Sequence, residues 1–342
     1  MEKIRVREPF AATSMRFYPA EESSCRDLLE RCLHEAEIDE LESESAHPGI
    51  PDDMARKEIR TASQADSAEP KRSERAEVHS VAGIVPHAGW IFSGATAARV
   101  FRRFLSNPPE TFILFGADHR GAVRCGGVDY VADHKGVWRT PVGTVAQDHS
   151  LAEHLLSTIP GLLEATPESH LREHSIEVQV PFIHCLFPEA KICPILVPPF
   201  TGAALLGRAV FRALEGWPNR VVAIGSTDLT HYGPAFGFTP AQPHLDPHSW
   251  AKNVNDRAMI HAIVDLAADD VLGICSTRRN ACGPGAIAAA VGFASEAGVR
   301  RGRLLQHITS SEVMPQANRE DFVGYAAIVF ERDESRGRGS HE

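Results

Sequence analysis

The sequence predicts an α/β fold, and two observations carry this prediction. After residue 80, apolar segments of strand length alternate with polar loops and with segments of helical periodicity. Several of the loops that follow these strands carry histidine, aspartate or cysteine, which is typical of the ligand-binding edge of an open α/β sheet. The 342 residues, 43% of them hydrophobic, can bury a sizeable core in one large domain or in two.

The predicted elements follow from apolar periodicity and turn residues. We expect roughly six to eight strands, with the clearest at residues 78–85, 111–115, 192–197, 220–224, 304–309 and 323–330. A hairpin is expected within residues 130–145. Helical periodicity occurs at 25–36, 95–105, 151–159, 173–187, 202–214 and 253–270, and in an alanine-rich segment that ends near Gly298. Ser93 is a candidate N-cap, and Pro181 predicts a kink.

Composition divides the chain into four segments. Residues 1–39 contain the first helix and are expected to form the amino-terminal part of the main domain. Residues 40–80 lack aromatic residues and have few large aliphatic ones, so they are expected to be a disordered charged insertion. Residues 81–332 are the main α/β domain, and 333–342 are a polar tail.

Charge and cysteine content exclude several classes of protein. The formal net charge of -10 and the absence of a basic run with interleaved aromatics argue against nucleic-acid binding. The chain lacks the ~18 consecutive apolar residues of a membrane span and a secretory leader pattern, so we expect a soluble cytoplasmic protein. Its seven cysteines show no CxxC spacing and fit a reducing compartment better than a disulfide framework.

Polar residues suited to metal chemistry follow the predicted strands. His87 comes after the strand at 78–85, His119 after 111–115, and Asp228 and His231 after 220–224, while Cys282 precedes the alanine-rich helix. Each alone has an ordinary structural interpretation, because a lone imidazole often contacts a loop carbonyl and a lone cysteine is often a small buried residue. These positions are equivalent in a repeated strand-loop-helix pattern, so we expect them to converge at one edge of the sheet.

If these residues converge as expected, their side chains predict a catalytic metal site. The imidazoles of His87 and His119 and the thiolate of Cys282 make three protein ligands and leave coordination positions open. The start of the following helix favours the thiolate form of Cys282. His231 is the candidate base, and Asp228 is a candidate for orienting an imidazole or binding the metal, although both also suit a loop-stabilising turn.

Five further residues are candidates for the surroundings of this site. Glu173, His174 and Glu177 begin the helix predicted at 173–187, where acidic residues suit either the helix dipole or a role behind the metal ligands. Trp90 and Tyr232 flank the proposed ligands and suit either a pocket wall or the core.

Six sequence blocks follow one another along the chain: Pro86-His-Ala-Gly-Trp-Ile-Phe-Ser-Gly, Phe112-Ile-Leu-Phe-Gly-Ala-Asp-His, Trp138-Arg-Thr-Pro-Val-Gly, Glu173-His-Ser-Ile-Glu-Val-Gln-Val-Pro-Phe, Ser226-Thr-Asp-Leu-Thr-His-Tyr and Ala281-Cys-Gly-Pro-Gly-Ala-Ile. In this order they resemble the signatures of the Memo family, whose prokaryotic members are labelled AmmeMemoRadiSam system protein B. Arg16-Phe-Tyr-Pro-Ala is similar to the family's amino-terminal block. Asp118 and Arg120 depart from the family pattern, which has Ser and a second His around the second histidine, and the 40–80 insertion is another departure.

The resemblance implies a three-layer α/β/α sandwich around a mixed, largely parallel sheet, related to the LigB-type class III extradiol dioxygenases, which use non-haem Fe(II). It implies that His87, His119 and Cys282 are metal ligands and that Asp228 and His231 line the pocket, with His231 in the place of the acid/base histidine. The ring-cleaving enzymes have a carboxylate where this chain has Cys282, and a thiolate changes the charge, redox potential and copper affinity of the site.

Three functions are consistent with these residues. The first is a redox enzyme that uses Fe(II), or copper, on an unknown small molecule. The second is a hydrolase in which zinc activates water. The third is a non-catalytic module that binds a peptide or a partner protein. The family label further implies a functional link to radical-SAM and AMMECR-type proteins.

Overall fold

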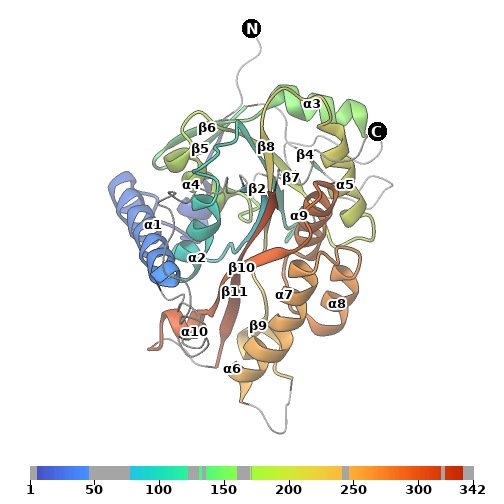
Figure 1. Cartoon of the computed structure of the whole chain (residues 1–342). Helices are drawn as coiled ribbons and strands as arrows, with labels where there is room; N and C mark the ends of the chain where they lie inside the picture. Colours follow the sequence, from blue (N-terminus) through green and yellow to red (C-terminus); the bar gives the residue numbers. More distant parts are fainter. Residues whose placement is uncertain are drawn as a thin grey trace, which may run out of the picture.

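The computed structural model describes residues 6–45, 78–121, 131–132, 136–159, 170, 172–240, 246–316 and 320–333. In these residues, a mixed eight-stranded sheet lies between two layers of helices, which confirms the predicted α/β fold (Figure 1). The strand order is β10-β11-β2-β8-β3-β7-β4, and the short β9 pairs with β11. The central strands β2, β8, β3 and β7 are parallel, whereas β11 and β4 flank them antiparallel.

The strands of the main sheet are β2 (Val78–Val85), β3 (Thr111–Gly116), β4 (Val131–Ala132), β7 (Lys191–Leu196), β8 (Val221–Ser226), β9 (His231–Tyr232), β10 (Gly302–Thr309) and β11 (Phe322–Asp333). A second, three-stranded sheet joins β1 (Val6–Arg7) to the hairpin of β5 (Val137–Thr140) and β6 (Gly143–Ala146). The central strands are almost wholly apolar because helices cover both faces of the parallel part of the sheet.

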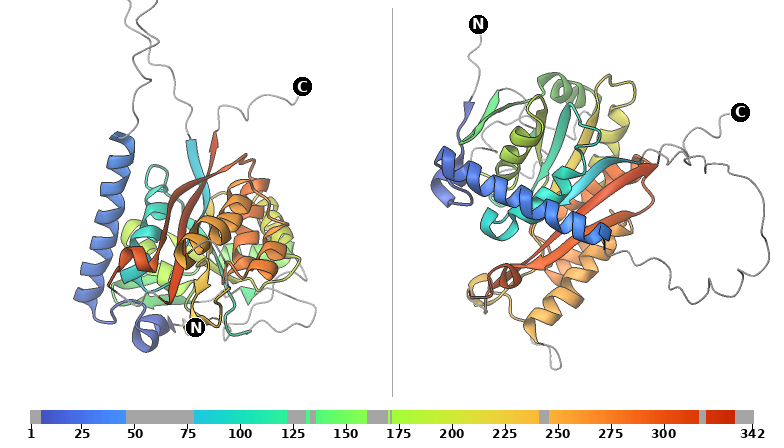
Figure 2. Two further views of the ribbon diagram at one scale, coloured as in Figure 1. Left: turned by 90° about the horizontal axis from the view of Figure 1, so that it is seen from below. Right: turned by 60° about the vertical axis from the view of Figure 1, so that its left-hand side comes forward.

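The helices form two layers, each with its own apolar core. One layer contains α1 (Glu22–Ser45), α2 (Trp90–Arg102) and α4 (Val180–Leu186), and Figure 2 shows α1 as its outermost element. The other contains α3 (His149–Thr158), α5 (Ala203–Ala213), α7 (Arg257–Val264), α8 (Val271–Arg278) and α9 (Pro284–Glu296). Short helical segments complete the described chain: Ala11–Met15, Glu177–Gln179, Pro234–Phe236, α6 (Pro247–Trp250), Ala251–Asp256 and α10 (Ser310–Val313).

Small residues explain why α5 and α9 pack so closely. A Cβ atom added at Gly207 would lie 1.8 Å from the Ala289 carbonyl oxygen, and one added at Gly292 would lie 2.3 Å from the Ala204 carbonyl oxygen. The alanine-rich composition of α9 is therefore a packing requirement, because the helix is buried nearly all round between β8 and α5.

Two predicted helix starts were wrong. The helix expected from residue 95 begins at Trp90 with Gly89 as its N-cap, and Ser93 lies inside it, where its hydroxyl donates to the Ala88 carbonyl. The helix expected from residue 173 begins only at Glu177, as a short 3-10 turn that leads into α4. Pro181 lies in the first turn of α4 and makes no kink, because a proline there removes no helical hydrogen bond.

The predicted insertion differs from the structure at both of its margins. Residues 40–45 continue α1 to Ser45, and residues 78–80 already belong to β2. The rest of the insertion, 46–77, lies outside the described residues, as does the predicted tail except for Asp333, the last residue of β11. None of the helices in the described part of the chain combines the length and apolar character needed to cross a membrane.

Candidate metal centre

The predicted ligands come from loops that leave one edge of the sheet. His87 follows β2, His119 follows β3 and Asp228 follows β8, and these three parallel strands are adjacent, with β8 in the middle. Cys282 precedes α9, and its backbone N–H donates to the Asp228 carbonyl at 3.2 Å. A Cβ at position 283 would lie 2.7 Å from the Ser226 carbonyl oxygen, so glycine is required where this loop approaches β8.

His87 points its Nε2 atom at the sulfur of Cys282. The two atoms are 3.1 Å apart, and the imidazole is buried. The Nδ1 atom of His87 lies 3.1 Å from the Ser226 hydroxyl, which itself donates to the Ser175 carbonyl at 2.6 Å. Because its proton is already used, that hydroxyl accepts from Nδ1–H, so Nε2 is the ring nitrogen that faces Cys282 and can bind a cation.

His119 is oriented in the same way by a carboxylate. Its Nδ1 atom lies 2.9 Å from Glu173 Oε1, while its backbone N–H donates to Glu173 Oε2 at 3.0 Å. Nδ1 therefore carries a proton, and Nε2 is the ring nitrogen left to bind a cation. The His119 ring stacks on that of His174, with centroids 4.7 Å apart, and lies edge-on to His87 at 5.0 Å.

Two overlapping groups of donor atoms result, and both contain His87. One consists of His87, His119 and His174, and the other of His87, Asp228 and Cys282, with the ligand atoms of each group within 4.8 Å of one another. Two ligand atoms that share a tetrahedral ion at ~2.0–2.3 Å are about 3.5 Å apart. The spacing of each group is therefore compatible with one cation after small side-chain movements.

The charges of the site are strongly coupled. Burial alone would raise the pKa of Cys282, but the charge of His87 and hydrogen bonds from His119 and His87 outweigh it and lower the pKa to about 6. Burial alone would lower the pKa of His119, but hydrogen bonds to Cys282 and Glu173 raise it to about 10. The protonated His119 ring thus bridges a thiolate and a carboxylate, a place where a metal cation can replace the proton.

The same charges, together with burial, shift the pKa values of Glu173 and His174. Burial opposes ionisation of Glu173, but its hydrogen bond to His119 and the charge of that ring keep the pKa of the carboxyl low. Burial and the nearby rings of His87 and His119 lower the pKa of His174 to about 3, so this imidazole is neutral and able to act as a ligand.

Asp228, a member of the second donor group, lies on the loop after β8, and His231 begins β9 just beyond this loop. Asp228 Oδ1 accepts the backbone N–H groups of His87 at 2.7 Å and Ala88 at 3.2 Å, so the carboxylate holds the loop after β2 in place. Burial raises the pKa of Asp228, and the nearby His231 lowers it in part. The Nδ1 atom of His231 donates to the Leu229 carbonyl at 3.1 Å, which leaves its Nε2 as the basic nitrogen.

The remaining predicted residues contact other parts of the molecule. Trp90 is buried in the core, stacks on Tyr18 and donates from its indole N–H to the Val178 carbonyl. Tyr232 stacks on Phe322 with centroids 5.0 Å apart, within a small cluster beside the main sheet.

Glu177 anchors the amino-terminal segment. Its buried carboxylate accepts from Arg7 Nη1 at 3.0 Å, from the Tyr18 hydroxyl at 2.9 Å and from the backbone N–H groups of residues 10–12. Arg7 also donates to the carbonyls of His170 and Glu173, and its guanidinium stacks on Trp138 at 3.8 Å. The segment that carries Glu173 and His174 is therefore fixed to β1.

Sequence reasoning missed the residues that orient His87. The sequence placed Ser226 in the loop after the strand predicted at 220–224 and Gln179 inside the helix predicted at 173–187, each within a family block but without a role of its own. The Gln179 amide donates to the Pro86 carbonyl at 2.8 Å and to the Ser226 hydroxyl at 3.1 Å, so it ties the loop after β2 to β8. Hydroxyl and amide side chains at such positions have no distinctive spacing, and their role depends on tertiary contacts.

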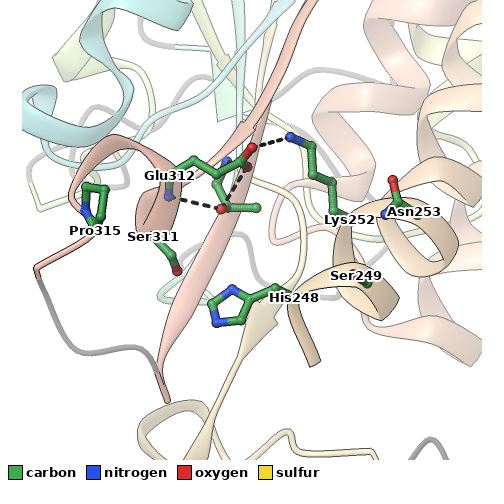
Figure 3. A pocket seen from close by; sticks show the side chains of 8 residues that line it. His248, Ser249, Lys252, Asn253, Ser311, Glu312 and Pro315 are labelled. Carbon is green, nitrogen blue, oxygen red and sulfur yellow. Dashed lines mark hydrogen bonds and ion pairs between the residues drawn. The ribbon is translucent and has the colours of Figure 1, made fainter. Parts of the chain in front are cut away.

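A separate cavity of about 360 Å³ lies between α6, the segment after it and α10. Figure 3 shows that Lys252 and Glu312 approach each other there, with Lys252 Nζ 2.5 Å from Glu312 Oε1. Its lining contains none of the predicted ligands: His248, Ser249, Lys252, Asn253, Thr309, Ser311, Glu312 and Pro315.

The fold and these loops define an α/β protein with a candidate metal centre at the carboxyl edge of its sheet. Residues 51–329 match the family described as Memo-like protein. MEMO1 family proteins of Thermococcus kodakarensis and Thermococcus onnurineus are 38% and 34% identical to the chain over 267 and 259 residues, respectively. Both alignments cover 73% of this chain and 87% of the relative. The chain belongs to the Memo family.

Other relatives agree with this assignment. The MEMO1 family protein of Pyrococcus furiosus is 32% identical over 259 residues, which is 73% of this chain and 86% of that protein. A crystal structure from Escherichia coli K12 aligns over 72% of this chain and 99% of its own, with 9% identity and a TM-score of 0.40, too low to support a conclusion about function.

Alkylation of metal-free protein tests the charge state of Cys282. Because the thiolate is the nucleophile, the rate should rise with pH and reach half its maximum near the pKa of about 6. Cys185 is an exposed internal control whose pKa is raised, mainly by burial, so its rate should still be rising above about pH 8.5. Iodoacetamide labelling with peptide mass spectrometry measures both, and a Cys282 midpoint above pH 8 would contradict the assignment.

Ser226→Ala tests whether the tautomer of His87 is held by its hydrogen bond. We expect about 10–100-fold weaker metal binding, because the ring loses the acceptor for its Nδ1 proton. Ser80→Ala is the matched control: it removes a buried hydroxyl that donates to the Arg103 carbonyl from the other end of β2. Competition with a chromophoric chelator measures affinity, and equal losses in the two variants would exclude this role for Ser226.

Proposed function

We propose that this protein binds Fe(II), or alternatively copper, through His87, His119 and Cys282, and that it is a redox enzyme for a small molecule. The main support is the pairing of His87 Nε2 with Cys282 Sγ at 3.1 Å, with Ser226 fixing the tautomer behind it. An imidazole held in this way presents a lone pair to a cation, and a neighbouring thiolate supplies negative charge.

The donor set suits a transition metal better than magnesium or calcium. Those ions take oxygen ligands, whereas a thiolate with imidazoles suits iron, copper or zinc. When bound, the metal would supply one-electron chemistry and polarise substrate oxygen atoms. The thiolate favours a redox role for iron or copper, because it strongly affects the potential of either metal.

The chain's own residues supply positioning and proton transfer. Glu173 orients the His119 ring, and Asp228 fixes the backbone at His87. The loops after β3 and β2 are thereby held in position. His231 presents Nε2 as a base for a substrate proton. The His119 side chain is 28% exposed, which gives small molecules access to this side of the site.

Elemental analysis of untagged protein purified without oxygen tests the proposal. We expect about one equivalent of iron or copper per chain, and a substrate-dependent change in its oxidation state when oxygen is admitted. One equivalent of zinc together with ester or amide hydrolysis would support the hydrolase instead. Protein that contains no metal and takes up none of the three ions would refute the metal centre.

A further inference from the structure

Two exposed arginines are neighbours, along the chain, of residues in the candidate metal centre. Arg120 directly follows His119, and Arg172 directly precedes Glu173, the carboxylate that holds His119. Arg120 Nε donates to the Arg172 carbonyl at 2.8 Å, so the guanidinium is fixed at one nitrogen, and its two terminal nitrogens have no hydrogen-bond partner among the described residues. Both residues are exposed.

Neither arginine has a carboxylate partner among the described residues. Several exposed arginines elsewhere on the described surface form ion pairs, among them Arg26 with Glu22 and Arg212 with Glu296, whereas others, such as Arg31 and Arg300, have no carboxylate partner there either. The Arg120 guanidinium therefore adds positive charge beside the segment that carries Glu173, in a chain whose net charge is -10.

A hydrogen bond places Arg120 beside the segment that carries Glu173 and His174, because its Nε donates to the carbonyl of Arg172, one residue before Glu173. After the larger effects of burial and of the His87 and His119 rings, the charge of Arg120 also lowers the pKa of His174. His174 stacks on His119 on one side and contacts Phe17 on the other, with ring centroids 4.7 Å and 4.5 Å away. Arg120 itself lies 5.6 Å from the ring of Phe10.

We propose that Arg120 selects the substrate: it binds an anionic group, carboxylate or phosphate, of a small molecule at the metal centre. The guanidinium fork forms paired hydrogen bonds with such groups, and one nitrogen held by the Arg172 carbonyl reduces the entropy lost on binding. The overall negative charge of the chain repels anions, so the positive charge of Arg120 would attract them to this edge of the sheet. The substrate role rests on the proposed enzyme function, whereas the anion site does not.

Calorimetric titration of the purified protein with benzoate and with inorganic phosphate tests the anion site and distinguishes the two chemistries. Arg120→Ala should lower the affinity for the anion at least about tenfold. Arg120→Lys should lower it less, because lysine keeps the positive charge but loses the paired donors of the guanidinium. Arg212→Ala is the charge-matched control, since it removes an exposed arginine on α5, and it should leave affinity unchanged. Neutral benzamide should not bind detectably.

Two results would overturn the anion site: unchanged affinity in Arg120→Ala, or wild-type protein that binds both anions more weakly than about 10 mM. Metal content is measured on the same samples, so the two proposals fail separately. Protein that contains no metal but loses anion affinity in Arg120→Ala would refute the metal centre and keep the anion site. Full metal content together with unchanged anion affinity in Arg120→Ala would keep the metal centre and refute the anion site.

Discussion

Metal is expected to be lost when either His87 or Cys282 is replaced with alanine. His87 belongs to both groups of donor atoms, and Cys282 supplies the only sulfur in either of them. Removal of one of three protein ligands leaves two, which is fewer than catalytic transition-metal sites use. Elemental analysis after dialysis should show less than about a tenth of the wild-type metal in each variant.

Two further histidine variants make this prediction specific. His149→Ala is the matched control, since His149 is an exposed residue on α3 that pairs with Glu153, and it should keep full metal. His174→Ala separates the two donor groups: it should keep most of the metal if Cys282 is the third ligand and lose it if His174 is. Full metal content in both His87→Ala and Cys282→Ala would contradict the proposed site.

Arg7→Met is expected to lower the free energy of unfolding by about 3–5 kcal/mol, because it leaves the Glu177 carboxylate buried without its cation. The carboxylate would keep its hydrogen bonds from Tyr18 and from the backbone of residues 10–12, but these do not neutralise it. Methionine fills a similar volume, so the effect is mainly electrostatic. Urea denaturation followed by circular dichroism measures the change.

A matched variant compares the buried Arg7–Glu177 pair with an ion pair at the surface. Arg139→Met breaks the Arg139–Glu8 pair on the neighbouring strand β5, where both side chains are more than half exposed, and should cost at most about 1 kcal/mol. The double variant Arg7→Met with Glu177→Gln should recover part of the lost stability, because it removes the unpaired charge. Equal losses for Arg7→Met and Arg139→Met would show that the Arg7–Glu177 pair has no special role.

Much of the fold was predictable because the parallel strands are buried on both faces. Residues 111–115 and 220–224 are nearly all apolar, and such runs read as strands without knowledge of their neighbours. The first residues of the helices were harder to predict. Glu173 looked like a residue of a first helical turn, but its carboxylate accepts hydrogen bonds from His119 and the backbone of Ser175, which hold it outside the helix.

The approach of His87 to Cys282 was predictable for the same topological reason. Both residues lie beside β8, one at the exit of the adjacent strand β2 and the other ahead of the helix that packs on β8. The roles of Ser226 and Arg7 were not predictable, because each depends on partners more than 50 residues away, such as Ser175 and Glu177. Their residue types alone have too many ordinary uses.

X-ray absorption spectroscopy at the metal edge of protein purified without oxygen measures the ligands themselves. We predict one sulfur neighbour at about 2.3 Å together with imidazole nitrogens, and loss of the sulfur signal in Cys282→Ser protein reloaded with the same metal. A wild-type spectrum that contains nitrogen and oxygen neighbours but no sulfur would contradict a centre built from His87, His119 and Cys282.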